Sequence, residues 1–107
     1  MEITLLGTGS PLPDPRRGGP ATLVRAGGQT ILVDAGRAVV MRLAGAGTLP
    51  VLLNAVLITH LHSDHITDLN DVITSHWVMT GIETPLNVYG PPGTQTVVDG
   101  ILMMLAP

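Results

Sequence analysis

The stretch that decides the fold covers residues 55–65 and consists of Ala-Val-Leu-Ile-Thr followed at once by His-Leu-His-Ser-Asp-His. The continuous apolar run over 55–59 predicts a strand that is covered on both faces. Three of the four histidines in the chain fall within the next six positions, together with Asp64. Side chains alternate along an extended segment, so His60 and His62 are expected to face the same way. The pattern predicts a polar cluster at the end of a buried strand.

The cluster has the composition of a metal site. Two imidazoles side by side can hold one borderline-soft cation, and Asp64 and His65, placed after the chain turns, can face a second. So many polar side chains are costly to bury without a partner, which disfavours a purely structural role in the core. A structural metal or a non-catalytic binding site remains an alternative, although structural zinc sites are closed by four ligands and a mixed Asp/His set favours an open one. Ser63 and Asp64 are expected to cap a following helix.

The rest of the chain predicts an α+β domain over residues 1–107 with no internal boundary. The order is strand, loop, hairpin, helix, strand, helix, strand, helix, which gives a mixed β-sheet with helices packed on it. Gly27-Gly28 is a hairpin turn signal, and Thr94 or Thr96 is expected to cap the last helix. The expected strands are 3–6 (buried), 21–26, 30–33, 55–59 and 86–89, the loop is 7–20, and the helices are 37–46, 66–79 (Ile66, Leu69, Ile73 and Trp77 on one side) and a last one from about 94.

Composition excludes several classes of function. The net charge is −3 and all five basic residues are arginines, so no broad nucleic-acid footprint is present. A polyanionic substrate would need local contacts or metal ions to supply positive charge. The absence of cysteine excludes disulfides and thiolate nucleophiles and suits the cytoplasm. No signal peptide is recognisable, and the apolar runs are too short to cross a bilayer, so no membrane partner is expected.

Three motifs resemble one family. The segment from Thr59 to His65 looks like the H-x-H-x-D-H signature of the metallo-β-lactamase superfamily. Leu-Gly-Thr-Gly-Ser over 6–10, with the loop after it, is similar to the start of ribonuclease Z and related phosphodiesterases. Val-Asp-Ala-Gly over 33–36 is similar to their strand-end aspartate motif, although those enzymes usually carry cysteine where this chain has Ala35.

The resemblance implies a fold and a set of ligands. The fold would be the N-terminal half of an αββα sandwich. His60 and His62 would bind a first Zn²⁺, and Asp64 and His65 a second, with Mn²⁺ as an alternative metal. Asp64 would be the catalytic residue that positions the attacking hydroxide or takes its proton. Asp34 would support the ligands from behind.

The resemblance also implies a function. It is that of a ribonuclease Z-like hydrolase, which cleaves a phosphodiester 3′ of a tRNA body with a metal-bound hydroxide and is a homodimer in its complete form. The alternatives are an arylsulfatase or a small cyclic-phosphodiester hydrolase with the same ligands, and an inactive fragment or half-domain that needs a partner. Complete members are two or three times longer and add two histidines and a bridging aspartate. The chain is therefore expected to be an N-terminal part with little activity alone.

Two smaller features leave their roles open. Arg16 and Arg17 are either solvated loop residues or a phosphate contact beside the metals. His76 follows His65 by eleven positions, about 16 Å along one helix, so the two cannot share a metal. His76 is expected to be a packing residue or a helix-surface residue.

Overall fold

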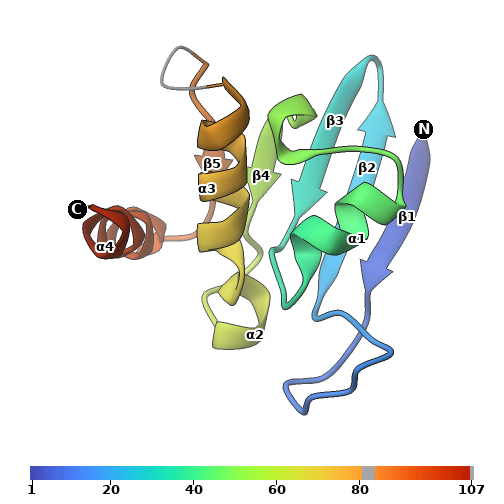
Figure 1. Ribbon diagram of the computed structural model, residues 1–107, viewed down its shortest axis with the longest axis horizontal. Coiled ribbons are helices and arrows are strands. Elements are labelled where there is room, and N and C mark those ends of the chain that lie inside the picture. Colours follow the sequence, from blue (N-terminus) through green and yellow to red (C-terminus); the bar gives the residue numbers. More distant parts are fainter. Residues whose placement is uncertain (81–83, 107) are drawn as a thin grey trace.

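A computed structural model describes residues 1–80 and 84–106 as one sheet with helices on it (Figure 1). Residues 81–83 and 107, which fall within the predicted domain 1–107, lie outside the described residues. The strands are β1 (Glu2–Gly7), β2 (Ala21–Ala26), β3 (Gln29–Val33), β4 (Ala55–Leu57) and β5 (Val88–Tyr89). The helices are α1 (Val39–Gly45), α2 (Ser63–Ile66), α3 (Leu69–Thr80) and α4 (Thr94–Leu105), with a short 3₁₀ helix, η1, at Pro50–Leu52.

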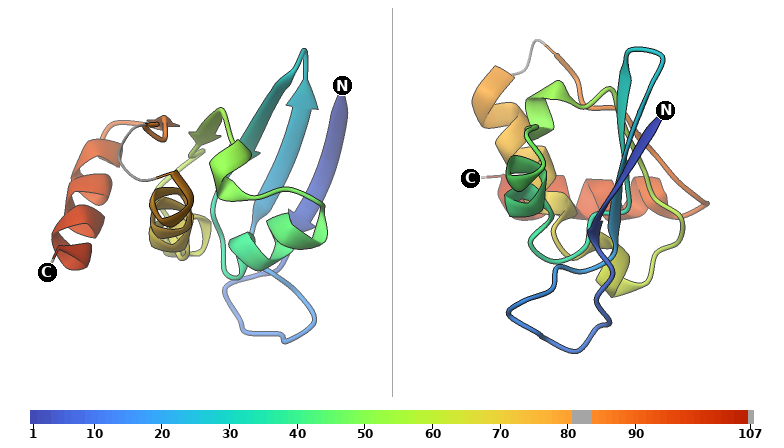
Figure 2. Two further views of the ribbon diagram at one scale, coloured as in Figure 1. Left: turned by 45° about the horizontal axis from the view of Figure 1, so that its top comes forward. Right: turned by 90° about the vertical axis from the view of Figure 1, so that its right-hand side faces the viewer.

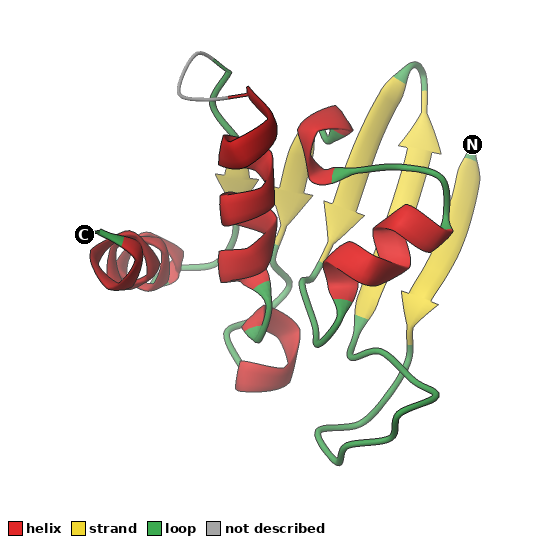
Figure 3. Ribbon diagram, viewed as in Figure 1, coloured by secondary structure: helices red, strands yellow, loops and turns green. Residues whose placement is uncertain are grey.

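The sheet is mixed, as the sequence predicted. Its strands follow chain order, with β1, β2 and β3 antiparallel and β3, β4 and β5 parallel (Figure 3). The predicted hairpin is present, because Ala26 pairs with Gln29 across the two glycines. Gly27 and Gly28 both have positive φ, 55° and 77°, as a two-residue turn between twisted strands requires.

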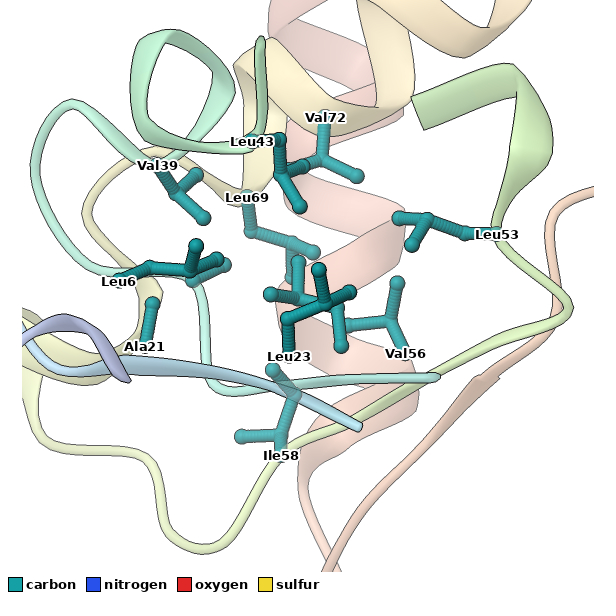
Figure 4. Close-up of a cluster of buried hydrophobic side chains, with 12 residues drawn as sticks. Leu6, Ala21, Leu23, Val39, Leu43, Leu53, Val56, Ile58, Leu69 and Val72 are labelled. Carbon is teal, nitrogen blue, oxygen red and sulfur yellow. The ribbon is translucent and has the colours of Figure 1, made fainter. Parts of the chain in front are cut away.

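The core lies between the sheet and the helices α1 and α3, which cover one of its faces (Figures 1 and 2). Leu23, Leu32 and Val56 are neighbours across β2, β3 and β4, and all three are fully buried. Leu43 of α1 and Leu69 and Val72 of α3 meet them in one aliphatic cluster (Figure 4). This core fixes the end of β4 from which the histidine cluster starts.

The other face of the sheet corrects two predictions. The strands at 3–6 and 55–59 were expected to be fully covered, but Ile3, Leu5 and Leu57 are 58%, 66% and 37% exposed. Side chains alternate along a strand, and no helix among the described residues packs on the second face, so every other residue of these apolar runs faces outward. Tyr89 of β5, in register with Leu57, is exposed on the same face.

The predicted helix 66–79 is α3, which begins at Leu69 and not at Ile66, because Asp68 bonds to another part of the chain. Its backbone N–H donates to the carbonyl of Ala35 at 3.0 Å, and its carboxylate accepts the N–H of Ala38 at 2.5 Å. The N–H of Asp68 is therefore not available for a hydrogen bond within a helix, and the regular helix starts only at Leu69. Trp77, expected on the same side as Ile66, Leu69 and Ile73, is 57% exposed, because α3 buries the row Leu69, Val72 and His76 instead.

The predicted caps are also wrong. Ser63 and Asp64 are the first residues of α2, and the N-cap is His62, with no side-chain cap hydrogen bond. The N-cap of α4 is Gly93, with φ of 102°. Thr94 is inside the helix, where its hydroxyl donates to the carbonyl of Pro91 at 2.7 Å.

Helix α4 lies beyond the β5 edge of the sheet (Figure 1). Val97, Val98 and Ile101 pack against the core, whereas Leu102, Met103, Met104 and Leu105 are 42–79% exposed. Over residues 1–80 and 84–106, none of the helices has the length and apolarity that a membrane span needs.

Candidate metal centre

The end of β4 gathers three histidine rings. The ring centroid of His60 is 4.7 Å from that of His62 and 4.0 Å from that of His65. His60 and His62 are exposed, and the His65 side chain is 19% exposed. Asp64 is adjacent, with Oδ2 3.7 Å from Nε2 of His65. The three imidazoles and one carboxylate therefore share one location, where β4 ends and α2 begins.

Asp34 anchors this cluster from the end of β3. Its backbone N–H donates to the carbonyl of Leu57 at 2.8 Å and extends the parallel pairing of β3 with β4. Its φ is 64°, in the left-handed region that few non-glycine residues occupy, and aspartate is among those that tolerate it. This bend keeps the carboxylate buried, with 8% of the side chain exposed.

The Asp34 carboxylate accepts three hydrogen bonds. Oδ1 accepts the backbone N–H of Thr59 at 2.8 Å. Oδ2 accepts the Thr59 hydroxyl at 2.8 Å and Nδ1 of His65 at 2.7 Å. The N–H of Ala35 also donates to the His65 carbonyl at 2.8 Å. Asp34 therefore fixes the ring of His65, and the neighbouring Ala35 fixes its backbone.

These bonds assign the tautomers of two histidines. An ionised carboxylate only accepts, so the His65 proton is on Nδ1 and its Nε2 carries the free lone pair. The Thr59 hydroxyl has one proton, which it gives to Asp34. Its contact with Nδ1 of His60 at 2.9 Å therefore requires a proton on that nitrogen, which leaves Nε2 of His60 free as well. One carboxylate thus orients two imidazoles, one directly and one through Thr59.

The donor chemistry fits a divalent metal ion. Metal-binding histidines usually donate their second ring N–H to a carboxylate or a similar acceptor, which is the arrangement of His65 on Asp34. Neutral imidazole and carboxylate are ligands of zinc. Within residues 1–80 and 84–106, however, no group of three or more His, Cys, Asp or Glu side chains is arranged to hold one ion. Among the described residues, the cluster therefore supplies suitable donors but not a closed site.

The arginines of the first loop take different positions. Arg16 is 87% exposed and pairs with Asp14, with Nε 3.3 Å from Oδ1. The Arg16 backbone N–H and guanidinium hold the pKa of the Asp14 carboxyl below its usual value. Arg17, 4.0 Å from the same carboxylate, lines a small hollow together with Arg37, Ser63 and Asp64. The structure brings Arg17 next to the cluster and leaves Arg16 out of that hollow.

The sequence analysis missed two residues, Thr59 and Arg37. Thr59 was included in the motif but given no role, although a hydroxyl directly before the first histidine was a usable signal. Arg37 was assigned to the start of a helix, and only the folded chain shows it at the hollow. His76, left between packing and surface, is 4% exposed and is a packing residue of α3.

The comparisons with known proteins agree with this architecture. Ribonuclease Z of Mycobacterium marinum (strain ATCC BAA-535 / M) is 59% identical over 104 residues, which cover 95% of this chain and 37% of the relative. Ribonuclease Z of Mycolicibacterium paratuberculosis (strain ATCC BAA-968 / K-10) is 54% identical over 107 residues, or 98% of this chain and 38% of the relative. The chain thus spans little more than a third of the length of these curated relatives.

Two solved structures have the same fold. The short form of human tRNase Z superposes with a TM-score of 0.86 at 29% identity, over 97% of this chain and 40% of that one. The metallo-β-lactamase fold protein YhfI from Bacillus subtilis superposes with a TM-score of 0.79 at 26% identity, over 92% and 39%. The mixed sheet, the helices on one face and the histidine cluster at the end of β4 therefore define the metallo-β-lactamase fold, as predicted.

Within that class, the chain belongs to the family described as anti-Pycsar protein Apyc1, whose model matches residues 1–96. The curated relatives carry the name ribonuclease Z, so the predicted likeness to ribonuclease Z is confirmed.

Proposed function

We propose that the protein is a metal-dependent hydrolase that cleaves a phosphodiester bond, of the ribonuclease Z type. The observation that carries the proposal is the paired orientation of His60 and His65 by Asp34, at 2.7 Å directly and at 2.8 Å and 2.9 Å through Thr59. Surface histidines without a ligand need no such support. Two imidazoles held with Nε2 free are ligands prepared for a cation.

In this proposal the four cluster residues hold two metal ions. His60 and His62 serve one ion, and Asp64 and His65 the other. Bound zinc, or manganese in its place, would acidify water and neutralise charge on the phosphate. Asp34 holds the ring of His65 in one tautomer throughout, which keeps Nε2 available at the site.

Asp64 is the proposed proton acceptor. Its carboxylate is 21% exposed, so solvent reaches it, and it lies 3.7 Å from Nε2 of His65. A water molecule beside Asp64 would give its proton to this carboxylate as it attacks phosphorus, and the leaving oxygen would depart on the far side. A carboxylate accepts this proton more readily when the water is already acidified, which would be the contribution of the metal.

The first loop is the proposed source of substrate choice. The cluster alone cannot distinguish among phosphodiesters, so selectivity must come from groups that reach past it. Arg16 and Arg17 are the only adjacent arginines in the chain, and Arg17 shares a hollow with Asp64. A guanidinium binds phosphate oxygens through paired hydrogen bonds. We assign the contact to this pair, with Arg17 the closer residue.

The proposed substrate is a precursor tRNA cut 3′ of its body, since the curated relatives are named ribonuclease Z. The second candidate substrate is a small cyclic phosphodiester, the alternative that the sequence analysis gave, since the matching family is described as anti-Pycsar protein Apyc1 and not as ribonuclease Z. We also propose that the complete protein is a homodimer and that it acts in the cytoplasm.

The test compares both substrates on the complete gene product. The protein is stripped of metal with a chelator, reloaded with zinc or manganese, and assayed on a precursor tRNA and on a 3′,5′-cyclic mononucleotide. The proposal requires cleavage of the precursor tRNA that depends on metal and is lost in Asp64→Asn. Cleavage of the cyclic nucleotide alone would select the second candidate, and metal-independent cleavage would overturn both.

The loop is tested separately with Arg16→Ala combined with Arg17→Ala. This variant should weaken precursor tRNA cleavage while leaving bis(p-nitrophenyl) phosphate nearly unaffected. An equal loss of kcat/KM on both would show that the arginines support the fold or the metals instead.

A further inference from the structure

We propose that Arg37 forms, with Arg17, a binding site for a phosphate group beside Asp64, and this proposal rests on the function proposed above. Arg37 lies outside both the first loop and the histidine motif, so neither feature gives it a role. It lies just before α1, in the segment that follows the anchoring Asp34. Arg37 lines the same hollow as Arg17, Ser63 and Asp64.

The other arginines are already engaged, which singles out these two. Arg16 pairs with Asp14, and Arg25 pairs with Glu2 at 2.9 Å. Arg42 donates from Nη2 to the carbonyl of Arg16 at 3.1 Å and so holds the base of the loop.

Among the described residues, neither arginine at the hollow is closely paired with a carboxylate. Over the described ranges 1–80 and 84–106, Arg37 has no carboxylate within ion-pair distance, and Arg17 reaches Asp14 only at 4.0 Å. The lining of the hollow therefore combines two arginines with one carboxylate, Asp64. The excess positive charge selects an anion.

Close backbone packing fixes the two arginines relative to each other. The N–H of Gly19 donates to the carbonyl of Arg37 at 2.9 Å, and the N–H of Gly36 donates to the carbonyl of Pro20 at 3.0 Å. A Cβ at Gly19 would lie 2.5 Å from the nitrogen of Arg37, and a Cβ at Gly36 would lie 2.5 Å from the carbonyl carbon of Gly19. Only glycine permits this approach, so the segment after Arg17 is locked against the segment that carries Arg37.

The chemistry of the pair defines the ligand. Guanidinium forks match the geometry of phosphate oxygens, and their charge cannot be titrated away near neutral pH. Asp64 lines the same hollow, so a phosphate bound there would lie next to the proposed proton acceptor. The ligand class is a phosphodiester, which either an RNA or a cyclic mononucleotide supplies.

The direct test measures binding of inorganic phosphate to the metal-free complete gene product. Arginine Nε–H resonances are followed during a phosphate titration of the wild type, Arg37→Gln, Arg37→Lys and Arg25→Gln. Loss of one charged hydrogen-bonding group should weaken phosphate binding about tenfold in Arg37→Gln. Arg37→Lys should recover part of the loss, because it keeps the charge and loses the fork. Arg25→Gln, the control, removes an arginine that pairs with Glu2 outside the hollow, and it should change phosphate binding less than about twofold.

The source of the phosphate is identified by turnover of the metal-loaded protein. A higher KM of Arg37→Gln for precursor tRNA alone assigns the site to a flanking nucleotide, and a higher KM for the cyclic mononucleotide as well assigns it to the reacting phosphate. Unchanged phosphate binding in Arg37→Gln, or an equal loss in Arg25→Gln, overturns the proposal. If no substrate is turned over but Arg37→Gln still loses phosphate binding, the proposed function fails and the phosphate site stands.

Discussion

Thr59→Val is the substitution that tests the hydrogen-bond network most cleanly. Valine has nearly the shape of threonine but no hydroxyl, so it removes the 2.8 Å bond to Oδ2 of Asp34 and the 2.9 Å contact with Nδ1 of His60. Asp34 keeps its bonds to the Thr59 backbone and to His65. The variant therefore disconnects His60 from the carboxylate and leaves His65 in place.

The expected magnitude follows from what is lost. A hydrogen bond to a charged group contributes about 1.5–3 kcal/mol. Thr59 is exposed, so solvent replaces part of the bond and the loss of unfolding free energy should be near 1 kcal/mol. Removing a group that orients a metal ligand typically lowers metal affinity about 10- to 100-fold. Zinc binding should therefore suffer more than folding does.

Three measurements on the complete gene product check this expectation. Urea unfolding gives the stability, competition with a chromophoric chelator gives the zinc affinity, and ¹⁵N spectra of the imidazole rings give the tautomers. In Thr59→Val the His60 ring should leave its single Nδ1–H form while His65 keeps it. Thr59→Ser, which retains the hydroxyl, should resemble the wild type in all three. Identical behaviour of the valine and serine variants, or an unchanged His60 spectrum, would refute the reasoning.

Three further predictions concern the loop and the chain as a whole. Gly36→Ala should lower the unfolding free energy by about 3 kcal/mol in urea titrations, since its Cβ would overlap the backbone of Gly19. The control Gly45→Ala, with open space around the added carbon, should not lower the unfolding free energy. An equal loss of unfolding free energy in both variants would contradict the packing argument. The Asp14 pKa, lowered first by the Arg16 N–H and then by its guanidinium, should move only part of the way back in Arg16→Gln when followed by ¹³C NMR. The lowered pKa contributes stability that is present above the unfolded pKa and lost as pH falls through the folded pKa, so Asp14→Asn should remove that contribution near neutral pH and not in strong acid. The 107-residue chain with zinc or manganese should show little or no turnover of bis(p-nitrophenyl) phosphate, because its described residues hold no three-ligand group; turnover at the rate of the complete product would contradict this.

The sequence predicted the features that depend on local pattern. The apolar run before His60 marked β4, the paired glycines marked the β2–β3 turn, and the mixed sheet followed from the order of elements along the chain. These features are encoded by neighbouring residues, whose periodicity and turn chemistry are visible without a structure.

The errors occur where distant residues meet. Nothing near Asp68 signals a helix break, because the break comes from its bond to Ala35, 33 positions earlier. The hydrogen bond from the Thr59 hydroxyl, which links His60 to the carboxylate, needs Asp34, 25 positions away in the sequence. The hollow at Arg37 depends on the packing of Gly19 on Gly36. The exposure of Ile3 and Leu5 could not be inferred from their apolarity, since an apolar run does not show whether both faces of its strand are covered.

The most direct test of the metal assignment is an anomalous difference map at the zinc edge, from crystals of the complete gene product loaded with zinc. The account predicts zinc peaks at the end of β4, about 2.0–2.1 Å from Nε2 of His60 and of His65, with Nδ1 of His65 still on Asp34. Zinc bound elsewhere on the protein, or bound through Nδ1 of His65 with Asp34 displaced, would contradict it.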